Sequence, residues 1–147
     1  MEMTNHYRAL EKMYQSSSSV KDWVPVDSMI IEQGKCTIKA PVRDTYFHAL
    51  NAIHGATYFK LLDDSSFFAV NSLVSDVFVL TTSFNISIIR PVQSGQITAV
   101  GSARFAGKNL FIAESTLYDE NNKEVAFGSG HFMKSRVELS PDIGYNL

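Results

Sequence analysis

The amino-acid sequence predicts an α+β fold in which one long central helix is wrapped by an antiparallel β-sheet of about five to six strands, with a short N-terminal helix beside it. Residues 56–74 form an apolar run without glycine or proline, which is too long for a strand and therefore predicts the helix. Four segments with alternating apolar residues follow it. The connections between these segments are too short for parallel crossovers, so the strands that they join must be antiparallel neighbours.

Size and composition favour one globular domain over residues 1–147. A chain of 147 residues is near the modal size of a single domain. Hydrophobic residues make up 45% of the chain, enough for a core, and only 19% are charged, too few for a disordered chain. Because the formal net charge is −2, no excess positive field attracts phosphate backbones, and nucleic acid is not expected as a partner.

The cysteine and hydropathy patterns favour a cytoplasmic protein without a metal. The single cysteine, Cys36, cannot form an internal disulfide, and no Cys/His cluster has the spacing of zinc ligands. Residues 1–15 lack the apolar stretch of a signal peptide, and no later run reaches about 18 uncharged apolar residues. We therefore expect no membrane partner, no metal and no cofactor.

The first third of the chain predicts two short elements. Residues 5–14 place apolar side chains at helical spacing between charged ones, which predicts the N-terminal amphipathic helix. The serine run 16–19 predicts a loop. Between residues 30 and 41, Cys36 and Ile38 alternate with polar residues, a pattern typical of a half-buried strand bounded by Gly34 and Pro41.

The central helix and the remaining strands follow a connection at residues 42–53. Apolar side chains fall nearly all round the wheel of the central helix, so we expect it to be buried on most faces. The sheet must then wrap it. Clusters of turn-forming residues separate the remaining predicted strands, which are residues 77–91, 96–105, 110–118 and 124–133.

Two adjacent carboxylates, Asp63 and Asp64, interrupt the apolar helix. Carboxylates are seldom buried without a partner. Asp64 has Lys60 one helical turn away, which favours a paired or solvated role. Asp63 shares its stripe with Phe59 and Phe67, whose rings would desolvate the carboxylate and raise its pKa, as suits a base or a nucleophile. The residues alone leave open whether Asp63 merely faces solvent or a partner subunit.

The dipeptide His54-Gly55 stands at the start of the central helix. Free backbone N–H groups at a helix N-terminus bind developing negative charge, and a glycine there lets a carbonyl approach closely. A histidine near a helix cap is also common without a catalytic role. His54 and Asp63 are nine residues apart, roughly 13 Å along the axis. Because one substrate atom cannot meet both, they would have to come from different subunits of an oligomer.

Two longer runs carry a resemblance to a known family. Residues 54–63 read HGATYFKLLD, and residues 83–95 read SFNISIIRPVQSG. With the Gly107-Lys108-Asn109 hairpin and the segment 119–126, they resemble the hotdog-fold acyl-CoA thioesterases of the PaaI-like type. In that family a His-Gly-Gly opens the central helix, an acidic residue follows nine positions after the histidine, and an apolar strand ends in a Pro-x-x-x-Gly turn. The resemblance covers about residues 34–134.

This resemblance implies hydrolysis of acyl-CoA thioesters to free acid and coenzyme A, at the interface of a homodimer or of a homotetramer. The backbone N–H of Gly55, next to His54, would polarise the thioester carbonyl. Asp63 of the neighbouring subunit would act as general base or nucleophile. Thr81 or Thr82 matches the region where the family often has a Ser or Thr near the carboxylate, which would orient the attacking water; a plain strand residue is the alternative for each.

The resemblance also suggests residues that bind the substrate. Lys108 and Arg90 would meet the phosphates of coenzyme A, or stay solvated at the surface. Phe59 and Phe67 belong to the ample apolar wall. The sequence does not decide which apolar side chains line a tunnel and which fill the core.

Three positions depart from the family pattern. His48 stands where the family usually has an asparagine beside the active site, and Asn51 stands where a glycine is common. Either of the two could supply the polar contact of the family asparagine. Ala56 replaces the second glycine of the His-Gly-Gly and adds a methyl group where the carbonyl approaches. All three are therefore candidates for binding the substrate.

Two further functions remain open from the sequence. His48 and Ala56 make a non-catalytic dimer that binds acyl-CoA or an acyl chain plausible. A hotdog dehydratase would need a histidine paired with a carboxylate across the interface, such as His48 with Asp63, but the extended signature of that family is absent.

Overall fold

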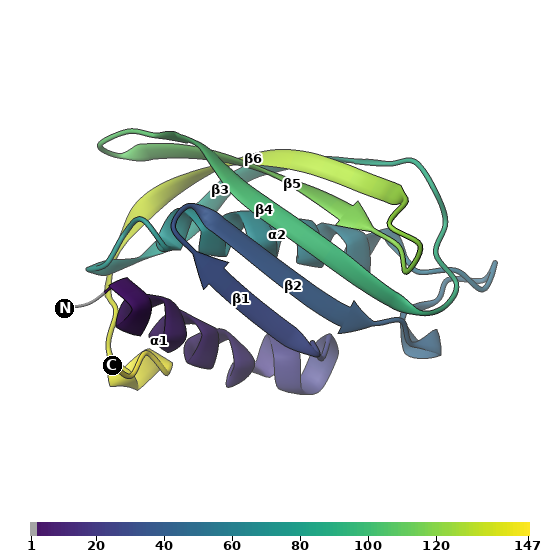
Figure 1. Ribbon diagram of the computed structural model, residues 1–147, viewed down its shortest axis with the longest axis horizontal. Coiled ribbons are helices and arrows are strands. Elements are labelled where there is room, and N and C mark those ends of the chain that lie inside the picture. Colours follow the sequence, from purple (N-terminus) through teal and green to yellow (C-terminus); the bar gives the residue numbers. More distant parts are fainter. Residues whose placement is uncertain (1–2) are drawn as a thin grey trace.

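The computed structural model describes residues 3–147, so residues 1 and 2 of the predicted domain lie outside the described part. One long helix lies across one face of a curved antiparallel sheet, and a shorter helix packs nearby (Figure 1). In chain order the helices and strands are α1 (Met3–Gln15), a π-helical turn (Ser19–Trp23), β1 (Ser28–Glu32), β2 (Lys35–Pro41), a 3₁₀ turn (Asp44–Tyr46), α2 (Gly55–Asn71), β3 (Val77–Ile88), β4 (Gln96–Ala106), β5 (Leu110–Tyr118), β6 (Glu124–Glu138) and a second 3₁₀ turn (Pro141–Ile143).

The six strands form one sheet in the order β1-β2-β4-β5-β6-β3, and every neighbouring pair is antiparallel. The predicted α+β arrangement of a central helix, an antiparallel sheet and a short N-terminal helix is confirmed. The strand predicted between Gly34 and Pro41 is present as β2, and β1, which the sequence pattern did not predict, precedes it in a hairpin. Gly34 turns the chain there with a φ of 70°, a conformation that glycine adopts without strain.

The sheet covers α2 along one side. Leu61, Leu62 and Ala69 of α2 are fully buried against it. At Gly101 of β4 the sheet approaches the helix so closely that a Cβ would collide with the carbonyl oxygen of Ser65. The sheet leaves another side of α2 open, and cavities lie along this side.

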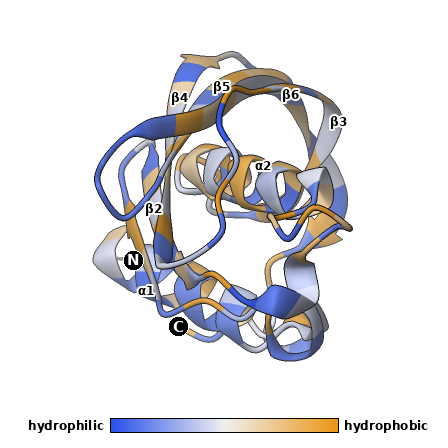
Figure 2. Cartoon of the chain, turned by 90° about the vertical axis from the view of Figure 1, so that its right-hand side faces the viewer, coloured by the Kyte–Doolittle hydropathy of each residue, from blue (hydrophilic) through white to orange (hydrophobic). Residues whose placement is uncertain are grey.

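Both chain ends lie on the open side of the sheet. Figure 2 shows α2 enclosed by the curve of the sheet, with α1 and the C-terminal segment together below it. The His6 ring, fully buried, has Nδ1 2.7 Å from the Tyr145 hydroxyl and Nε2 2.9 Å from the carbonyl oxygen of Asn71. This histidine therefore joins α1, the C-terminal segment and the end of α2. In residues 3–147 no helix has the length and apolar character that crossing a membrane requires.

Candidate active site

Asp63 lies in the middle of the open side of α2. Ala56, Phe59, Asp63 and Phe67 follow one another at intervals of three or four residues and so share one stripe. Phe59 is 39% exposed, and Asp63 and Phe67 are partly buried. α2 is thus buried on most faces, as the sequence predicts, and the stripe that stays partly exposed is the one that carries the candidate carboxylate.

Burial raises the pKa of Asp63 from 3.8 to about 6. The Thr81 hydroxyl, which donates to Asp63 Oδ1 at 2.8 Å, lowers this pKa, while the carboxylate of Asp64 raises it and the charge of Lys60 lowers it. A carboxyl group with such a pKa is mostly ionised at neutral pH and can still accept a proton from a reacting group.

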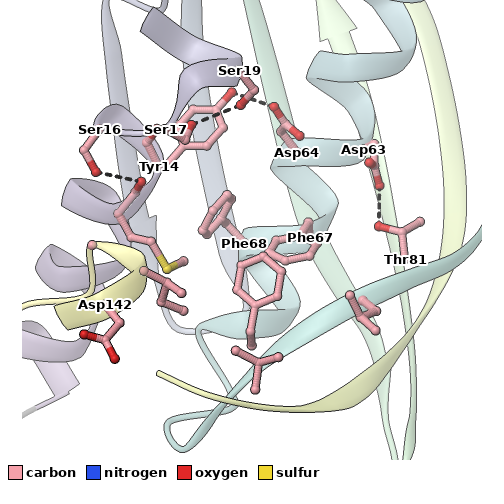
Figure 3. Close-up of a pocket in the computed structure, with 16 residues that line it drawn as sticks. Tyr14, Ser16, Ser17, Ser19, Asp63, Asp64, Phe67, Phe68, Thr81 and Asp142 are labelled. Atoms are coloured by element: carbon pink, nitrogen blue, oxygen red, sulfur yellow. Dashed lines mark hydrogen bonds between the residues drawn. The ribbon is translucent and has the colours of Figure 1, made fainter. Parts of the chain in front are cut away.

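The structure distinguishes Thr81 from Thr82. On β3, Thr81 pairs with Phe132 and Ser83 pairs with His131 of β6, so Thr82 is the extra residue of a β-bulge. Thr82 is exposed and donates its hydroxyl to the His131 carbonyl oxygen at 3.1 Å. Thr81 instead points toward α2 and reaches Asp63 (Figure 3).

Asp64 belongs to a separate, largely buried ion pair. Its Oδ2 atom lies 2.5 Å from Lys60 Nζ and accepts a hydrogen bond from the Tyr14 hydroxyl at 2.6 Å. The Lys60 side chain is only 5% exposed, and its ammonium lies over the rings of Tyr14 and Trp23. The pairing of Asp64 with Lys60 that the helical spacing predicts is therefore present. Because Tyr14 belongs to α1 and Asp64 to α2, the hydrogen bond between them also holds α1 against α2.

His54 caps the start of α2. Its extended backbone precedes the helix, its Nδ1 accepts a hydrogen bond from Ala56 N at 3.0 Å, and its carbonyl accepts one from Thr57 N at 3.0 Å. Helix geometry leaves the first N–H groups without a partner in the helix. Within the described residues, the Gly55 N–H donates no hydrogen bond to His54 or to another residue, and it stays available to a ligand. The role of His54 in this geometry is therefore to organise the helix start.

His48 and Asn51 lie in the loop before α2. His48 is exposed, and its Nδ1 accepts a hydrogen bond from Leu50 N at 3.1 Å. It lines a small cavity of about 330 Å³, named the third cavity because two larger cavities reach Asp63. The third cavity also reaches Gly55 but does not reach Asp63. Asn51 is exposed in a left-handed turn with a φ of 60°. Within one copy of the chain, neither residue is brought together with Asp63.

The two candidate phosphate-binding cations lie at different ends of the molecule. Arg90 is exposed in the third cavity, near the start of α2, and donates to the Glu124 carbonyl oxygen at 2.6 Å. Lys108 is exposed in the β4–β5 hairpin, at the opposite end of the sheet (Figure 1). Among residues 3–147, no cluster of His, Cys, Asp or Glu side chains is placed to hold a metal ion.

Two larger cavities meet at Asp63. The large cavity, about 890 Å³, lies between α1, α2, β3 and the C-terminal segment and includes Thr81 and Phe67 (Figure 3). The second cavity, about 650 Å³, extends from Asp63 toward the helix start. Besides Asp63 and Asp64, it is lined by Ser19, Trp23, His54, Gly55, Ala56, Phe59, Lys60 and Ile86.

Sequence reasoning does not identify several walls of the large cavity. Met13 and Tyr14 come from α1, and Val137 and Ile143 come from the C-terminal part of the chain. The helical pattern of α1 marks Met13 and Tyr14 as buried, but no local signal shows which cavity they face. Only contacts between distant parts of the chain bring them to Asp63.

Comparison with known proteins identifies the family. The profile described as the thioesterase superfamily matches residues 50–126, more than half of the chain and including the start of α2, Asp63 and Thr81. The chain belongs to the thioesterase superfamily. Thioester hydrolysis is the reaction class that membership in this superfamily supports. No curated protein matches the sequence.

Solved structures similar to this thioesterase-superfamily chain share its fold. The PaaI protein from the phenylacetic acid degradation operon of E. coli matches with a TM-score of 0.84 and 19% identity, over 94% of this chain and 99% of that one. A thioesterase of Haemophilus influenzae matches with a TM-score of 0.74 and 17% identity, over 86% and 88%. A conserved protein of Pseudomonas aeruginosa matches with a TM-score of 0.75 and 24% identity, over 83% and 98%. The hotdog fold expected from the sequence is thereby confirmed.

Proposed function

We propose that this protein hydrolyses acyl-CoA thioesters to a free acid and coenzyme A, with Asp63 as general base or nucleophile. The observation that carries the proposal is the Asp63–Thr81 pair, in which a partly buried carboxylate with a pKa of about 6 lies where two cavities meet. Such a carboxylate is charged at neutral pH and only weakly solvated, which suits both roles.

Thr81 supports the positioning of this carboxylate. Its hydroxyl donates to Oδ1, which leaves Oδ2 of Asp63 free of that bond and able to accept a proton from water. The hydroxyl oxygen of Thr81 can in turn accept a hydrogen bond from the same water. Thr81 therefore fixes both the carboxylate and the direction from which water attacks.

Gly55 is proposed to donate its backbone N–H to the carbonyl oxygen of the thioester. Its N–H is left available by the cap that His54 provides to Ala56 and Thr57, and the positive end of the α2 dipole adds to its effect on a developing oxyanion. Gly55 precedes Asp63 by eight residues, about 12 Å along the helix. The thioester is therefore held between Gly55 of one subunit and Asp63 of another.

The exposed edge of the sheet supports a homodimer. β3 is the last strand of the sheet, so one side of its backbone has no strand partner among residues 3–147. Leu80, Ile88 and Ile89, on β3 or directly after it, are 46–50% exposed. Long apolar edges of this kind are rarely left open in proteins. Pairing of two β3 strands across a two-fold axis would cover this edge and bring the open stripes of two α2 helices together.

Arg90 is the better placed of the two candidate cations for the phosphates of coenzyme A. It is exposed close to Gly55, in the third cavity, and its guanidinium can bind a phosphate oxygen in bidentate fashion. Lys108 lies far from the helix start of its own subunit and contributes only if a partner subunit brings it near.

The test is thiol release from a panel of acyl-CoA substrates. Asp63→Asn should lower kcat/KM by about 10²-fold or more, as loss of a general base or nucleophile does. Thr81→Val should lower kcat with little change in KM, and Thr82→Val, one residue along the strand, is the matched control that should leave both unchanged. Full activity of Asp63→Asn would exclude the proposed role of this carboxylate.

The second candidate function is non-catalytic binding of acyl-CoA. Ala56 favours it, because an exposed methyl group stands at the helix start next to Gly55 and narrows the approach of a carbonyl. Thermal stabilisation by acyl-CoA without release of free thiol would support this function over hydrolysis.

A further inference from the structure

The large cavity is lined mainly by apolar and aromatic side chains. The rings of Tyr14 and Phe68 have centroids 5.1 Å apart, and Phe67 lies 5.0 Å from both Phe68 and Phe78, at tilted or edge-to-face angles. Rings held in this way form a rigid wall. Thr81 and the two aspartates mark one end of the cavity, and the phenylalanine pair lies between this end and the C-terminal segment (Figure 3).

The charged groups that line this cavity are all acidic. Asp63 and Asp64 lie at one end, and Asp142 lies on the other side of the phenylalanine pair (Figure 3). No described lysine or arginine lines the large cavity. Lys60, the cation that pairs with Asp64, lines the second cavity. A ligand carrying its own carboxylate into the large cavity would be desolvated there without a counter-charge.

Two lining residues of β3 give a length scale for one wall of the cavity. Phe78 and Thr81 line the same wall on β3 and are three residues apart, about 10 Å at 3.3 Å per residue. Carbon–carbon bonds of about 1.5 Å advance an extended chain by about 1.3 Å per carbon. The wall therefore accommodates a chain of about eight carbons beyond Asp63.

The two chain ends form the rest of this cavity. Met13 of α1 and Ile143 of the C-terminal 3₁₀ turn line it together, and a Cβ at Gly144 would lie 3.5 Å from Met13 Cα. Both side chains lie outside residues 50–126, the part matched by the superfamily profile. This part of the wall is thus formed by segments other than those that define the family.

Resting on the proposed thioester hydrolysis, we propose that the large cavity holds the acyl group of the substrate and selects neutral, apolar acyl groups of about eight carbons over acyl groups that end in a carboxylate. Met13 and Ile143 set the limit of chain length. The carbonyl carbon lies at the aspartate end, and the tail extends past the phenylalanine pair.

The first experiment compares thiol release from hexanoyl-, octanoyl-, palmitoyl- and adipyl-CoA. We expect the highest kcat/KM with octanoyl-CoA and about tenfold or more lower kcat/KM with adipyl-CoA than with hexanoyl-CoA, because adipyl has the same six carbons with a carboxylate in place of the terminal methyl group. Equal use of adipyl- and hexanoyl-CoA, or a preference for palmitoyl-CoA, would overturn the assignment of the acyl site while leaving hydrolysis itself intact.

The second experiment changes the wall of the cavity. Ile143→Trp should move the preference from octanoyl- to shorter acyl groups, and Met13→Ala should move it to longer ones. Ile30→Trp is the matched control, since Ile30 is 52% exposed on β1 and lines none of the described cavities. An unchanged chain-length profile in both cavity variants refutes the role of the chain ends.

A third measurement separates failure of this inference from failure of the proposed function. If no acyl-CoA releases thiol, calorimetric titration of the wild-type protein with octanoyl-CoA, adipyl-CoA and coenzyme A tests the cavity by binding alone. Tighter binding of octanoyl-CoA than of the other two, weakened by Ile143→Trp, supports the acyl site without catalysis. Equal binding of all three refutes it.

Discussion

Replacement of Asp63 by asparagine should stabilise the protein at alkaline pH. Burial raises the pKa of this carboxyl from 3.8 to about 6, so the folded protein favours the protonated form over the ionised one. Between these two values the folded state binds more protons than the unfolded state, and the free energy of unfolding therefore falls as the pH rises. Above about pH 6 the ionised Asp63 lowers the free energy of unfolding by its full amount, and asparagine, which carries no charge, removes this loss.

The structure gives the magnitude of this effect. A pKa shift of about two units corresponds to about 3 kcal/mol at 1.36 kcal/mol per unit. Asp63 is only partly buried, so solvent screening reduces the expected gain to about 1–2 kcal/mol. The side-chain oxygen of asparagine can still accept the hydrogen bond from Thr81, so the substitution removes the charge with little change in contacts.

The assay is urea unfolding of the wild type and Asp63→Asn at pH 8 and pH 4, at one fixed protein concentration because the protein is proposed to be a dimer. The gain should be present at pH 8 and nearly lost at pH 4. Asp76→Asn, at an exposed aspartate, is the matched control and should change stability little at either pH. An asparagine variant that is no more stable than the wild type at pH 8, or equally stabilised at both pH values, would refute the reasoning.

Further predictions concern the same helix. Asp64→Asn should lower the free energy of unfolding by about 3–5 kcal/mol in urea, because it leaves the buried ammonium of Lys60 unpaired, and Lys60→Met in the same chain should recover most of the loss. Gly101→Ala should lower the Tm by several degrees, about 1–3 kcal/mol of overpacking, since its Cβ would collide with the backbone of α2. Gly55→Ala should not, because its Cβ would meet Ile88 Cδ1 at an ordinary van der Waals distance of 3.5 Å. If Asp63 is the base, kcat/KM should fall as the pH drops below about 6 and this carboxyl becomes protonated, which a pH–rate profile will show.

The sequence determined those features that depend on local periodicity. An apolar run without helix breakers predicts α2, and alternating segments with turn residues between them predict β3 to β6, because hydrophobic spacing follows the backbone repeat. The same spacing predicts the pairing of Lys60 with Asp64 and places Asp63 on an aromatic stripe. Each of these features joins residues within one element, so the order of the residues is sufficient to specify it.

Only the tertiary structure decided how the elements combine around Asp63. The bulge at Thr82 shifts the alternation of β3 by one residue and turns Thr81 toward the carboxylate, and it depends on pairing with β6, which no local pattern records. The walls formed by Met13 and Ile143 require α1 and the C-terminal segment to meet on the open side of α2. The physical reason is the same in both cases: burial and hydrogen bonding between segments far apart in the chain select these contacts.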